Sequence, residues 1–430
     1  MNIAVAGLWH LGTVTAACLA AAGYRVIGFD EHAATIAGLQ AGHLPVFEPG
    51  LQDLVRAGRE TGRLSFSSAP TAVASAEIVW VAYDTPVDED DRADVASVIE
   101  RITALFPYVR QGALVVLSSQ LPAGSTRRLE ELYKNSRPDG TATFAYSPEN
   151  LRLGKAIEAF TRPERVVVGV RAAADTSRIA TLLKPFTEHI EWVSVESAEM
   201  TKHALNTFLA MSVAFINELA VLCERVGADA REVERGLKSD GRIGPRAYIR
   251  PGSAFAGGTL ARDLAFLIER GRTDSLPVPL LAGVQQSNDV HKQWPRRCLV
   301  EVFGSVAARA IAVLGLTYKP GTDTLRRSSA IETCRWLHEQ GAAVVAYDPA
   351  VKALPVEFRA AIDLRPSIEA AVQGASAVLV ATEWPEFTAL SAAELVRWMP
   401  HPVVLDPGGF LEAQLGRDKR IRYLSVGRPA

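Results

Sequence analysis

The N-terminal part of the chain alternates short apolar runs with stretches in which apolar residues recur at helical spacing. The run at 3–6 is continuously apolar, which is typical of a parallel strand buried on both faces. An alanine-rich stretch follows, Gly23 is placed to end a helix, and a second apolar run covers 24–29. Further runs lie in AEIVWVAYDTP, GALVVLSSQLP, TATFAYSPENL and ERVVVGV. This alternation predicts a mostly parallel sheet covered by helices.

The pattern changes at residue 197, where SAEMTKHALNTFLAMSVAFINELAVLCERVG predicts one long amphipathic helix. Lys202 and Asn206 are four residues apart, so they share one face of this helix. A lysine on such a helix commonly extends its ammonium group to solvent, and spacing alone leaves that interpretation open. A second long helical region follows Asp263. Because the first helix has apolar residues on several sides, it can also form a dimer interface.

Strand-like runs return at 310–316 and in the segments GAAVVAYDP, ASAVLVATEW and PVVLDPGGF, so the last third repeats the pattern of the first. The predicted fold class is α/β, with two Rossmann-like doubly wound parallel-sheet domains joined by a long-helix central domain. We place the three domains at 1–196, 197–300 and 301–430. The duplication suggests that one outer domain binds a cofactor and the other a nucleotide substrate.

Composition excludes several classes of protein. The 430 residues are 48% hydrophobic and 22% charged, with a formal net charge of -2, so nucleic-acid binding has no electrostatic support. No segment at the N-terminus has the pattern of a signal peptide, and no apolar run approaches the roughly 20 residues that span a membrane. The four cysteines are scattered without zinc-site spacing or a disulfide framework. We therefore expect a cytoplasmic protein without a metal site.

The first predicted strand leads into an incomplete dinucleotide-binding fingerprint. Gly7, Trp9 and Gly12 occupy the three positions of G-x-G-x-x-G, so the middle glycine is replaced by tryptophan. That position normally lets the backbone approach a pyrophosphate, which leaves open a unit that has lost its cofactor. Asp30 follows Gly12 by 18 residues and ends the second strand. A carboxylate there accepts ribose hydroxyls and repels a 2′-phosphate, so the expected cofactor is NAD.

Polar side chains follow several of the predicted strands, namely Thr85, Ser119, Gln120, Glu149 and Asn150. Turn chemistry explains each of them singly, but ligands of open α/β sheets bind where the carboxyl ends of the strands meet. A second candidate functional segment is AFAGGTLARD at 254–263. It contains two adjacent glycines, a hydroxyl, a cation and a carboxylate within a few residues.

The order of these motifs resembles the UDP-glucose and GDP-mannose dehydrogenase family, NAD-dependent enzymes that oxidise C6 of a nucleotide sugar. The resemblance runs essentially from end to end. The matching segments include FEPGL, DTP, PAGST, SPENLRLGKAI, RPERVVVG, AEMTKHALNTFLAMSVAFINE, DGRIGPRAYIRPGSAFAGG, VLGLTYKPGTDTLRRSSA, AYDP and ATEWPEF. Ten segments in the family's order are far more specific than any one of them.

The resemblance implies a role for each matching residue. Lys202 and Asn206 are expected to hold the substrate hydroxyl and an ordered water, Asp263 to position that water, and Glu149 to lie beside the reacting carbon. Cofactor contacts are expected from the fingerprint positions, Thr85 and Arg326. Substrate contacts are expected from Asn150, Arg242, Tyr248, Gly257 and Lys319. In the family the arginine typically reaches across from the partner subunit of a homodimer, which we expect here too.

The departures from the family concentrate near the expected active centre. Thr259 aligns with the nucleophilic cysteine, Gln120 with a threonine, Asn150 with a phenylalanine and Gly409 with an asparagine; Trp9 replaces the middle glycine. In the family, the cysteine thiolate adds to an aldehyde and leads to a second hydride transfer and an acid. A threonine hydroxyl is a far weaker nucleophile. We count both Thr259 and Gln120 among the catalytic positions.

The leading hypothesis is an NAD-dependent enzyme that takes one hydride from a nucleotide sugar, a UDP-sugar by resemblance. It stops at a carbonyl product or reaches the acid slowly through a hydrated aldehyde. A redox-neutral epimerase that retains its NADH is an alternative, and so is a non-catalytic nucleotide-sugar binding protein. A four-electron dehydrogenase with unusual residues also fits the pattern.

Overall fold

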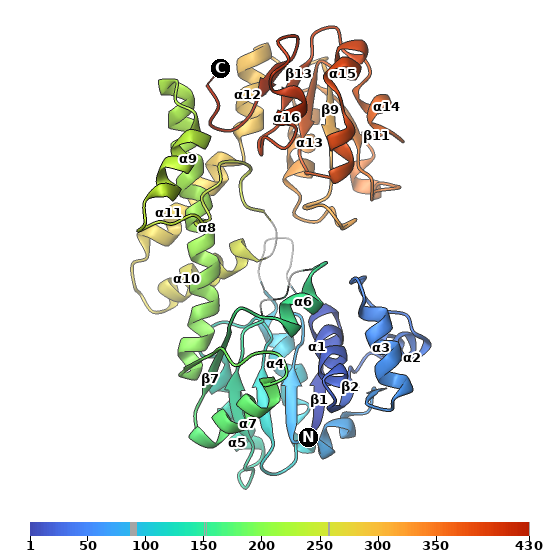
Figure 1. Cartoon of the computed structure of the whole chain (residues 1–430), viewed down its shortest axis with the longest axis vertical. Coiled ribbons are helices and arrows are strands. Elements are labelled where there is room, and N and C mark those ends of the chain that lie inside the picture. The colour runs from blue at the N-terminus through green and yellow to red at the C-terminus, as the bar shows by residue number, and fades with distance from the viewer. Residues whose placement is uncertain (87–92, 150, 152, 257–258, 430) are drawn as a thin grey trace. The chain divides into compact units, whose positions relative to one another are not determined.

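The computed structural model describes residues 1–86, 93–149, 151, 153–256 and 259–429. It divides into two compact units, Met1–Ala204 and Leu205–Ala430, each with its own sheet (Figure 1).

The first unit is built on an eight-stranded sheet with the order β3-β2-β1-β4-β5-β6-β7-β8. Its strands are β1 (Asn2–Ala6), β2 (Arg25–Phe29), β3 (Leu64–Ser67), β4 (Ile78–Val81), β5 (Leu114–Leu117), β6 (Thr143–Tyr146), β7 (Val166–Val170) and β8 (Ile190–Val193). Among the described residues the neighbouring strands are parallel, except for β6 and β7. The mostly parallel sheet is thus confirmed. Since β1 lies between β2 and β4, the switch point that binds ligands in such folds lies at its carboxyl end.

Helices cover both faces of this sheet, and β1 is therefore buried on both sides. Ile3 and Val5 belong to one hydrophobic cluster, and Ala4 and Ala6 to another. The helices are α1 (His10–Ala21), α2 (Ala33–Ala41), α3 (Leu51–Glu60), α4 (Val95–Thr103), α5 (Ser125–Ser136), α6 (Ala156–Thr161) and α7 (Ala173–Leu183), with 3-10 turns η1 (Pro70–Ser75) and η2 (Phe106–Tyr108). The small side chains of the alanine-rich α1 let this helix lie in the core, beside α3 and α6 (Figure 1).

The second unit repeats this topology. Its six strands have the order β11-β10-β9-β12-β13-β14 and are parallel in the described residues. They are β9 (Ala310–Leu314), β10 (Ala343–Tyr347), β11 (Asp363–Leu364), β12 (Ala377–Val380), β13 (Val403–Leu405) and β14 (Arg422–Leu424). The strand predicted at 310–316 ends two residues early because Gly315, with a φ of 87°, turns the chain away.

The long helix α8 (Val195–Val226) begins two residues before the predicted position and runs through the division between the units. The other helices of the second unit are α9 (Ala230–Ser239), α10 (Leu260–Thr273), α11 (Pro279–His291), α12 (Trp294–Phe303), α13 (Ser329–Glu339), α14 (Ile368–Val372), α15 (Ala392–Trp398) and α16 (Glu412–Leu415), with 3-10 turns η3 (Val356–Phe358) and η4 (Pro385–Ala389). Two parallel sheets and a long central helix confirm the predicted fold class.

By length and composition, α8 is the one helix among the described residues that is able to cross a membrane. We did not expect such a segment, because polar residues interrupt its apolar run. A core helix of a globular protein meets the same criterion, and 44% of its most apolar stretch is buried in the protein. Some of its polar side chains are satisfied internally: Asn217 accepts from the Gly252 amide at 3.0 Å and donates to the Ser253 carbonyl at 3.3 Å.

Candidate active site

The turn after β1 needs two of the three fingerprint glycines. Gly7 has a φ of 92°, and a Cβ added there would lie 2.6 Å from Cδ1 of Tyr83. A Cβ on Gly12 would lie 1.7 Å from the Gly7 carbonyl oxygen. Trp9 is different, because its side chain is 51% exposed and has an ordinary backbone conformation. The first and third positions therefore require glycine for packing, whereas the middle one accommodates tryptophan.

The same turn presents the N-terminus of α1, which begins at His10. Trp9 is the N-cap residue, and its side chain makes no capping hydrogen bond. An uncapped helix N-terminus attracts anions through its N–H groups and its dipole. The turn therefore fits the pyrophosphate of a dinucleotide.

Asp30 lies at the carboxyl end of β2, where the fingerprint predicts a ribose-binding carboxylate. It is buried, and its Oδ2 accepts a hydrogen bond from the Leu8 amide at 2.8 Å. Its Oδ1 accepts from the His32 amide at 3.1 Å. These bonds fix the carboxylate beside the fingerprint turn.

Two charged residues that sequence reasoning missed support this edge. Arg101 of α4 lies 3.8 Å from Asp30 and 4.0 Å from the centre of the Tyr83 ring, and it pairs with Glu31. Glu48 is buried and accepts from the Gly154 and Ala156 amides, each at 2.8 Å, and it pairs with His10 at 2.9 Å. The segment FEPGL marked the second of these. Nothing local in the sequence marked the first, since it lies in an ordinary amphipathic helix.

Lys202 turns its ammonium group into the protein. The residue is 6% exposed, and Nζ donates to the Glu149 carbonyl at 2.5 Å. The same Nζ lies 3.7 Å from Oε1 of the Glu149 carboxylate, whose Oε2 accepts from the Leu151 amide at 2.9 Å. The interpretation that this lysine extends to solvent is therefore wrong. A cation and a carboxylate lie together at the end of β6.

Thr85 and Gln120 also come together, because they follow the neighbouring strands β4 and β5. Both are buried, and the Thr85 hydroxyl donates to the Gln120 carbonyl at 2.7 Å. Two of the polar strand ends thus meet at one edge of the sheet.

In the second unit, the Asn206 amide donates to Oδ2 of Asp263. Asp263 is completely buried in the first turn of α10, and its own amide donates to the Thr259 carbonyl at 3.2 Å. Thr259 is the N-cap residue of that helix, and its exposed hydroxyl makes no capping bond. A buried carboxylate and an exposed hydroxyl therefore lie one helical turn apart.

Other predicted substrate contacts lie at the surface. The Arg242 side chain is 90% exposed and pairs with Asp240 at 2.8 Å, and Tyr248 is exposed as well. Asn150 and Gly257 lie outside the residues that the structure describes.

The carboxyl edge of the second sheet repeats the geometry of the first. Gly315 has a φ of 87°, and a Cβ there would lie 2.5 Å from Cβ of Thr382. Asp348 ends β10, and its Oδ2 accepts from the Leu316 amide at 2.7 Å, as Asp30 accepts from Leu8. Two strand–turn–helix motifs are therefore built by the same backbone contacts.

A cavity of about 160 Å³ lies in the second unit, at the carboxyl ends of β9 and β12 and the start of α13. Its lining includes Lys292, Thr317, Tyr318, Ser328 and Ser329. Lys319 and Arg326 lie in the segment between β9 and α13, with Nζ of the lysine 5.4 Å from the centre of the Tyr318 ring. The hydroxyls and the Lys292 side chain that line this cavity suit a phosphorylated ligand.

Gly409 has a φ of 64°, a conformation that glycine and asparagine tolerate better than other residues. The exchange of asparagine for glycine at this position is thus explained by the backbone.

The structure offers no reactive thiol. Each of the four cysteines, Cys18, Cys223, Cys298 and Cys334, is buried and free of disulfides. Burial raises the pKa of each thiol, to about 12 for Cys18, Cys298 and Cys334. All four are therefore thiols rather than thiolates at neutral pH.

Three family models match the chain. The NAD binding domain of the UDP-glucose/GDP-mannose dehydrogenase family matches residues 1–187, the central domain 196–290 and the UDP binding domain 312–413. The UDP-glucose 6-dehydrogenase of Rhizobium meliloti (strain 1021) is 34% identical over 438 residues, which cover 100% of both chains. UDP-glucose 6-dehydrogenase TuaD of Bacillus subtilis (strain 168) is 31% identical over 100% of this chain and 94% of its own.

A solved structure is similar as well. The UDP-glucose dehydrogenase from the hyperthermophilic archaeon Pyrobaculum islandicum has a TM-score of 0.88 at 28% identity, covering 99% of this chain and 98% of its own.

The fingerprint geometry predicts opposite outcomes for two substitutions to alanine. Gly12→Ala forces a methyl group against the Gly7 carbonyl, so we expect it to lower the free energy of unfolding by about 2 kcal/mol or more and to abolish NAD binding. Trp9→Ala removes an exposed side chain, so we expect a change within about 0.5 kcal/mol. Denaturant unfolding and titration calorimetry with NAD measure both. A larger loss from Trp9→Ala than from Gly12→Ala would contradict this account of the turn.

Proposed function

The chain belongs to the UDP-glucose/GDP-mannose dehydrogenase family, and from this premise we propose that it oxidises the C6 alcohol of a UDP-sugar without the thioester route to the acid. As a member it is an NAD-dependent nucleotide-sugar dehydrogenase. The finer proposal is carried by Thr259, which the resemblance aligns with the family's nucleophilic cysteine.

In the first oxidation the substrate hydroxyl must lose its proton while a hydride leaves C6, so the site needs a group that assists this loss. When bound, NAD accepts that hydride. Lys202 is suited to this role. Its buried ammonium group donates to the Glu149 carbonyl and lies near the Glu149 carboxylate. We propose that it holds the substrate hydroxyl and stabilises the negative charge that develops on its oxygen as the proton departs. Glu149 lies beside the reacting carbon in this proposal.

The Asn206–Asp263 pair supplies the second part of the proposed machinery. The completely buried Asp263 carboxylate accepts a hydrogen bond from the Asn206 amide, which helps to fix its orientation. We propose that this pair holds the ordered water that accepts the proton of the C6 hydroxyl as the hydride leaves C6 for NAD. Gln120, which is held through its carbonyl by Thr85, completes the proposed catalytic group.

The second oxidation needs a nucleophile that adds to the aldehyde. A cysteine meets this need because part of it is thiolate at neutral pH, and a helix N-terminus lowers its pKa further. The Thr259 hydroxyl occupies such a terminus but is far less acidic. The four cysteines are buried with raised pKa values, so none supplies a substitute thiolate. We propose that the product is the aldehyde, with slow passage to the acid through its hydrate.

The remaining proposed contacts divide between cofactor and substrate. For NAD they are Gly7, Trp9, Gly12, Asp30, Thr85 and Arg326. For the nucleotide sugar they are Asn150, Arg242, Tyr248, Gly257 and Lys319. The cavity at the start of α13 supports a nucleotide site, because it gathers hydroxyls and a lysine at the ends of parallel strands. We keep 1–196, 197–300 and 301–430 as the proposed functional domains and the cytoplasm as the proposed location.

We also propose a homodimer that is formed through α8. Phe208, Phe215 and Leu222 are exposed and recur every seven residues, and Leu205 and Val226 are exposed near the same stripe. A stripe with this spacing is suited to packing against another helix. The exposure of Arg242 fits a residue that completes its contacts in a partner subunit.

The stoichiometry of NADH tests the proposal. We expect the full-length protein, given NAD and UDP-glucose, to form one NADH per sugar and an aldehyde that a hydrazine reagent traps. Thr259→Cys places a thiol at the N-terminus of α10, so we expect two NADH per sugar and a carboxylate. Thr259→Ser, which adds no thiol, is the matched control and should behave like the wild type.

Mass spectrometry of the products separates the other outcomes. Two NADH and a carboxylate from the wild type would show that Thr259 does not block the second oxidation. Sugar conversion at unchanged mass without net NADH would favour the redox-neutral epimerase. GDP- and dTDP-sugars assayed in parallel decide the nucleotide.

The dimer is tested by charge placed on the α8 stripe. Phe215→Glu combined with Leu222→Glu should give a monomer, because burying two carboxylates in an apolar contact is costly. Val356→Glu changes an apolar residue elsewhere that is more exposed than either stripe residue, and it should leave the mass unchanged. Sedimentation equilibrium reports the mass of each. A wild-type monomer, or an intact dimer in the double variant, would refute this interface.

A further inference from the structure

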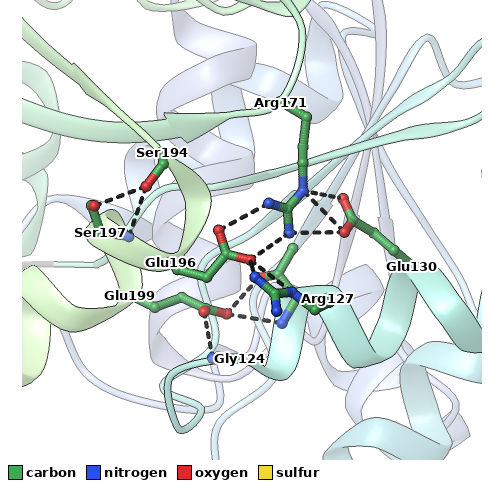
Figure 2. A network of polar contacts seen from close by, with 9 residues as sticks. Gly124, Arg127, Glu130, Arg171, Ser194, Glu196, Ser197 and Glu199 are labelled. Carbon is green, nitrogen blue, oxygen red and sulfur yellow. Dashed lines mark hydrogen bonds and ion pairs between the residues drawn. The ribbon is translucent and has the colours of Figure 1, made fainter.

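Glu199 is a buried carboxylate whose partners are hydrogen-bond donors from one short segment. The residue is 0% exposed. Oε2 accepts from the Gly124 amide at 2.6 Å, and Oε1 accepts from the Thr126 amide at 2.8 Å and the Thr126 hydroxyl at 2.6 Å (Figure 2). Three hydrogen bonds of 2.6–2.8 Å therefore fix the Glu199 carboxyl group on this segment.

The contact supplies a helix cap from a distant part of the chain. The N-cap residue of α5 is Gly124, which has no side chain to offer and a φ of 95°. The cap comes instead from α8, 75 residues later along the chain. An ordinary serine or aspartate at the N-cap would satisfy the Thr126 amide locally. A distant carboxylate does the same and also ties the start of α8 to the start of α5.

The segment 118–124, which connects β5 to α5, carries the catalytic position Gln120. The Gln120 carbonyl accepts from Thr85 at 2.7 Å, and the Leu121 carbonyl lies 3.0 Å from Nε2 of His203, whose ring is buried. Glu199 and His203 stand three residues before and one residue after Lys202 on α8. The helix therefore holds this segment on both sides of the lysine.

An outer set of ion pairs joins the same elements but is exposed. Glu196 accepts from Arg127 at 2.7 Å and from Arg171 at 2.9 Å, and Arg171 also pairs with Glu130 (Figure 2). The hydrogen bond from Arg171 lowers the pKa of Glu196 to about 2. Such surface pairs contribute modestly to stability. Glu196 is thus a natural control, because it lies on the same helix one turn earlier.

We propose that Glu199 is a positioning residue for hydride transfer. By holding the segment 118–124 and the start of α5 against α8, it sets the distance between Lys202 and Gln120. It also keeps the lysine ammonium on the Glu149 carbonyl. The inference rests on the proposed function of Lys202. It adds a residue that touches no reactant and acts through the loop.

The kinetic test compares Glu199→Gln with Glu196→Gln in the full-length protein, with NAD and UDP-glucose. A glutamine at 199 turns an N–H donor towards the donors of the loop and cannot accept from all of them. We expect kcat to fall about tenfold to a hundredfold, with KM for NAD within about twofold, since small misplacements cost this much. Glu196→Gln should keep kcat within about twofold. Equal kcat values in the two variants would overturn the proposal.

Thr126→Val is a milder variant that tests the same contact if the Glu199→Gln protein does not fold. It removes only the hydroxyl bond and keeps the side-chain shape, so kcat should fall in the same direction, by about threefold. If kcat of this variant equals that of the wild type while its melting temperature falls, Glu199 is only a structural cap.

A second measurement needs no substrate. Acetylation of Lys202 by acetic anhydride, followed by peptide mass spectrometry, should be several times faster in Glu199→Gln than in the wild type or Glu196→Gln, because the lysine loses its burial. Unchanged acetylation refutes the positioning role. Should the wild type oxidise no nucleotide sugar, the proposed function fails, and the acetylation rates still decide the role of Glu199.

Discussion

Polar groups that are buried at the ends of parallel strands must find partners within the protein, and this requirement shapes both units. Leaving a buried carboxylate unpaired costs several kcal/mol, so each one observed here is bonded to specific donors. Asp30 is bonded to the Leu8 amide and Asp348 to the Leu316 amide. Glu48 and Glu199 bond the starts of helices. The bonds that satisfy these carboxylates also fix the turns on which ligands are expected to rest.

The repeated turn shows how one solution serves two ligands. In both units a glycine with positive φ follows the central strand, and its Cα lies too close to a neighbouring strand end for any side chain. The carboxylate of the next strand then bonds the residue after this glycine. Beyond the turn the units differ: an alanine-rich helix begins directly in the first, whereas Lys319 and Arg326 lie in a longer connection in the second. The backbone motif is shared, and the side chains beyond it decide which phosphate compound fits.

The sequence predicted what depends on periodicity and failed where a contact joins distant residues. Continuous apolar runs located the strands, because a strand buried on both faces has no polar side. The fingerprint located the turn even with Trp9 in it, since the packing constraint acts on Gly7 and Gly12 only. Arg101 and Glu199 were missed because their partners are far away in the sequence. Arg101 lies 71 positions after Asp30, and Glu199 lies 75 positions after Gly124. At Gly409 the φ of 64° accommodates either glycine or asparagine, and periodicity could not predict this backbone conformation.

In the proposed function, Thr259 separates two reactions that share one site in the family. The first hydride transfer needs a fixed alcohol and a way to remove its proton, and we propose Lys202, Asn206 and Asp263 for that purpose. The second needs an anion that adds to the aldehyde. A helix N-terminus stabilises an anion by at most about 2 kcal/mol, which suffices to populate a thiolate but not an alkoxide. Water is then the remaining nucleophile. On this proposal, the exchange of cysteine for threonine removes the covalent step and leaves the rest of the proposed machinery intact.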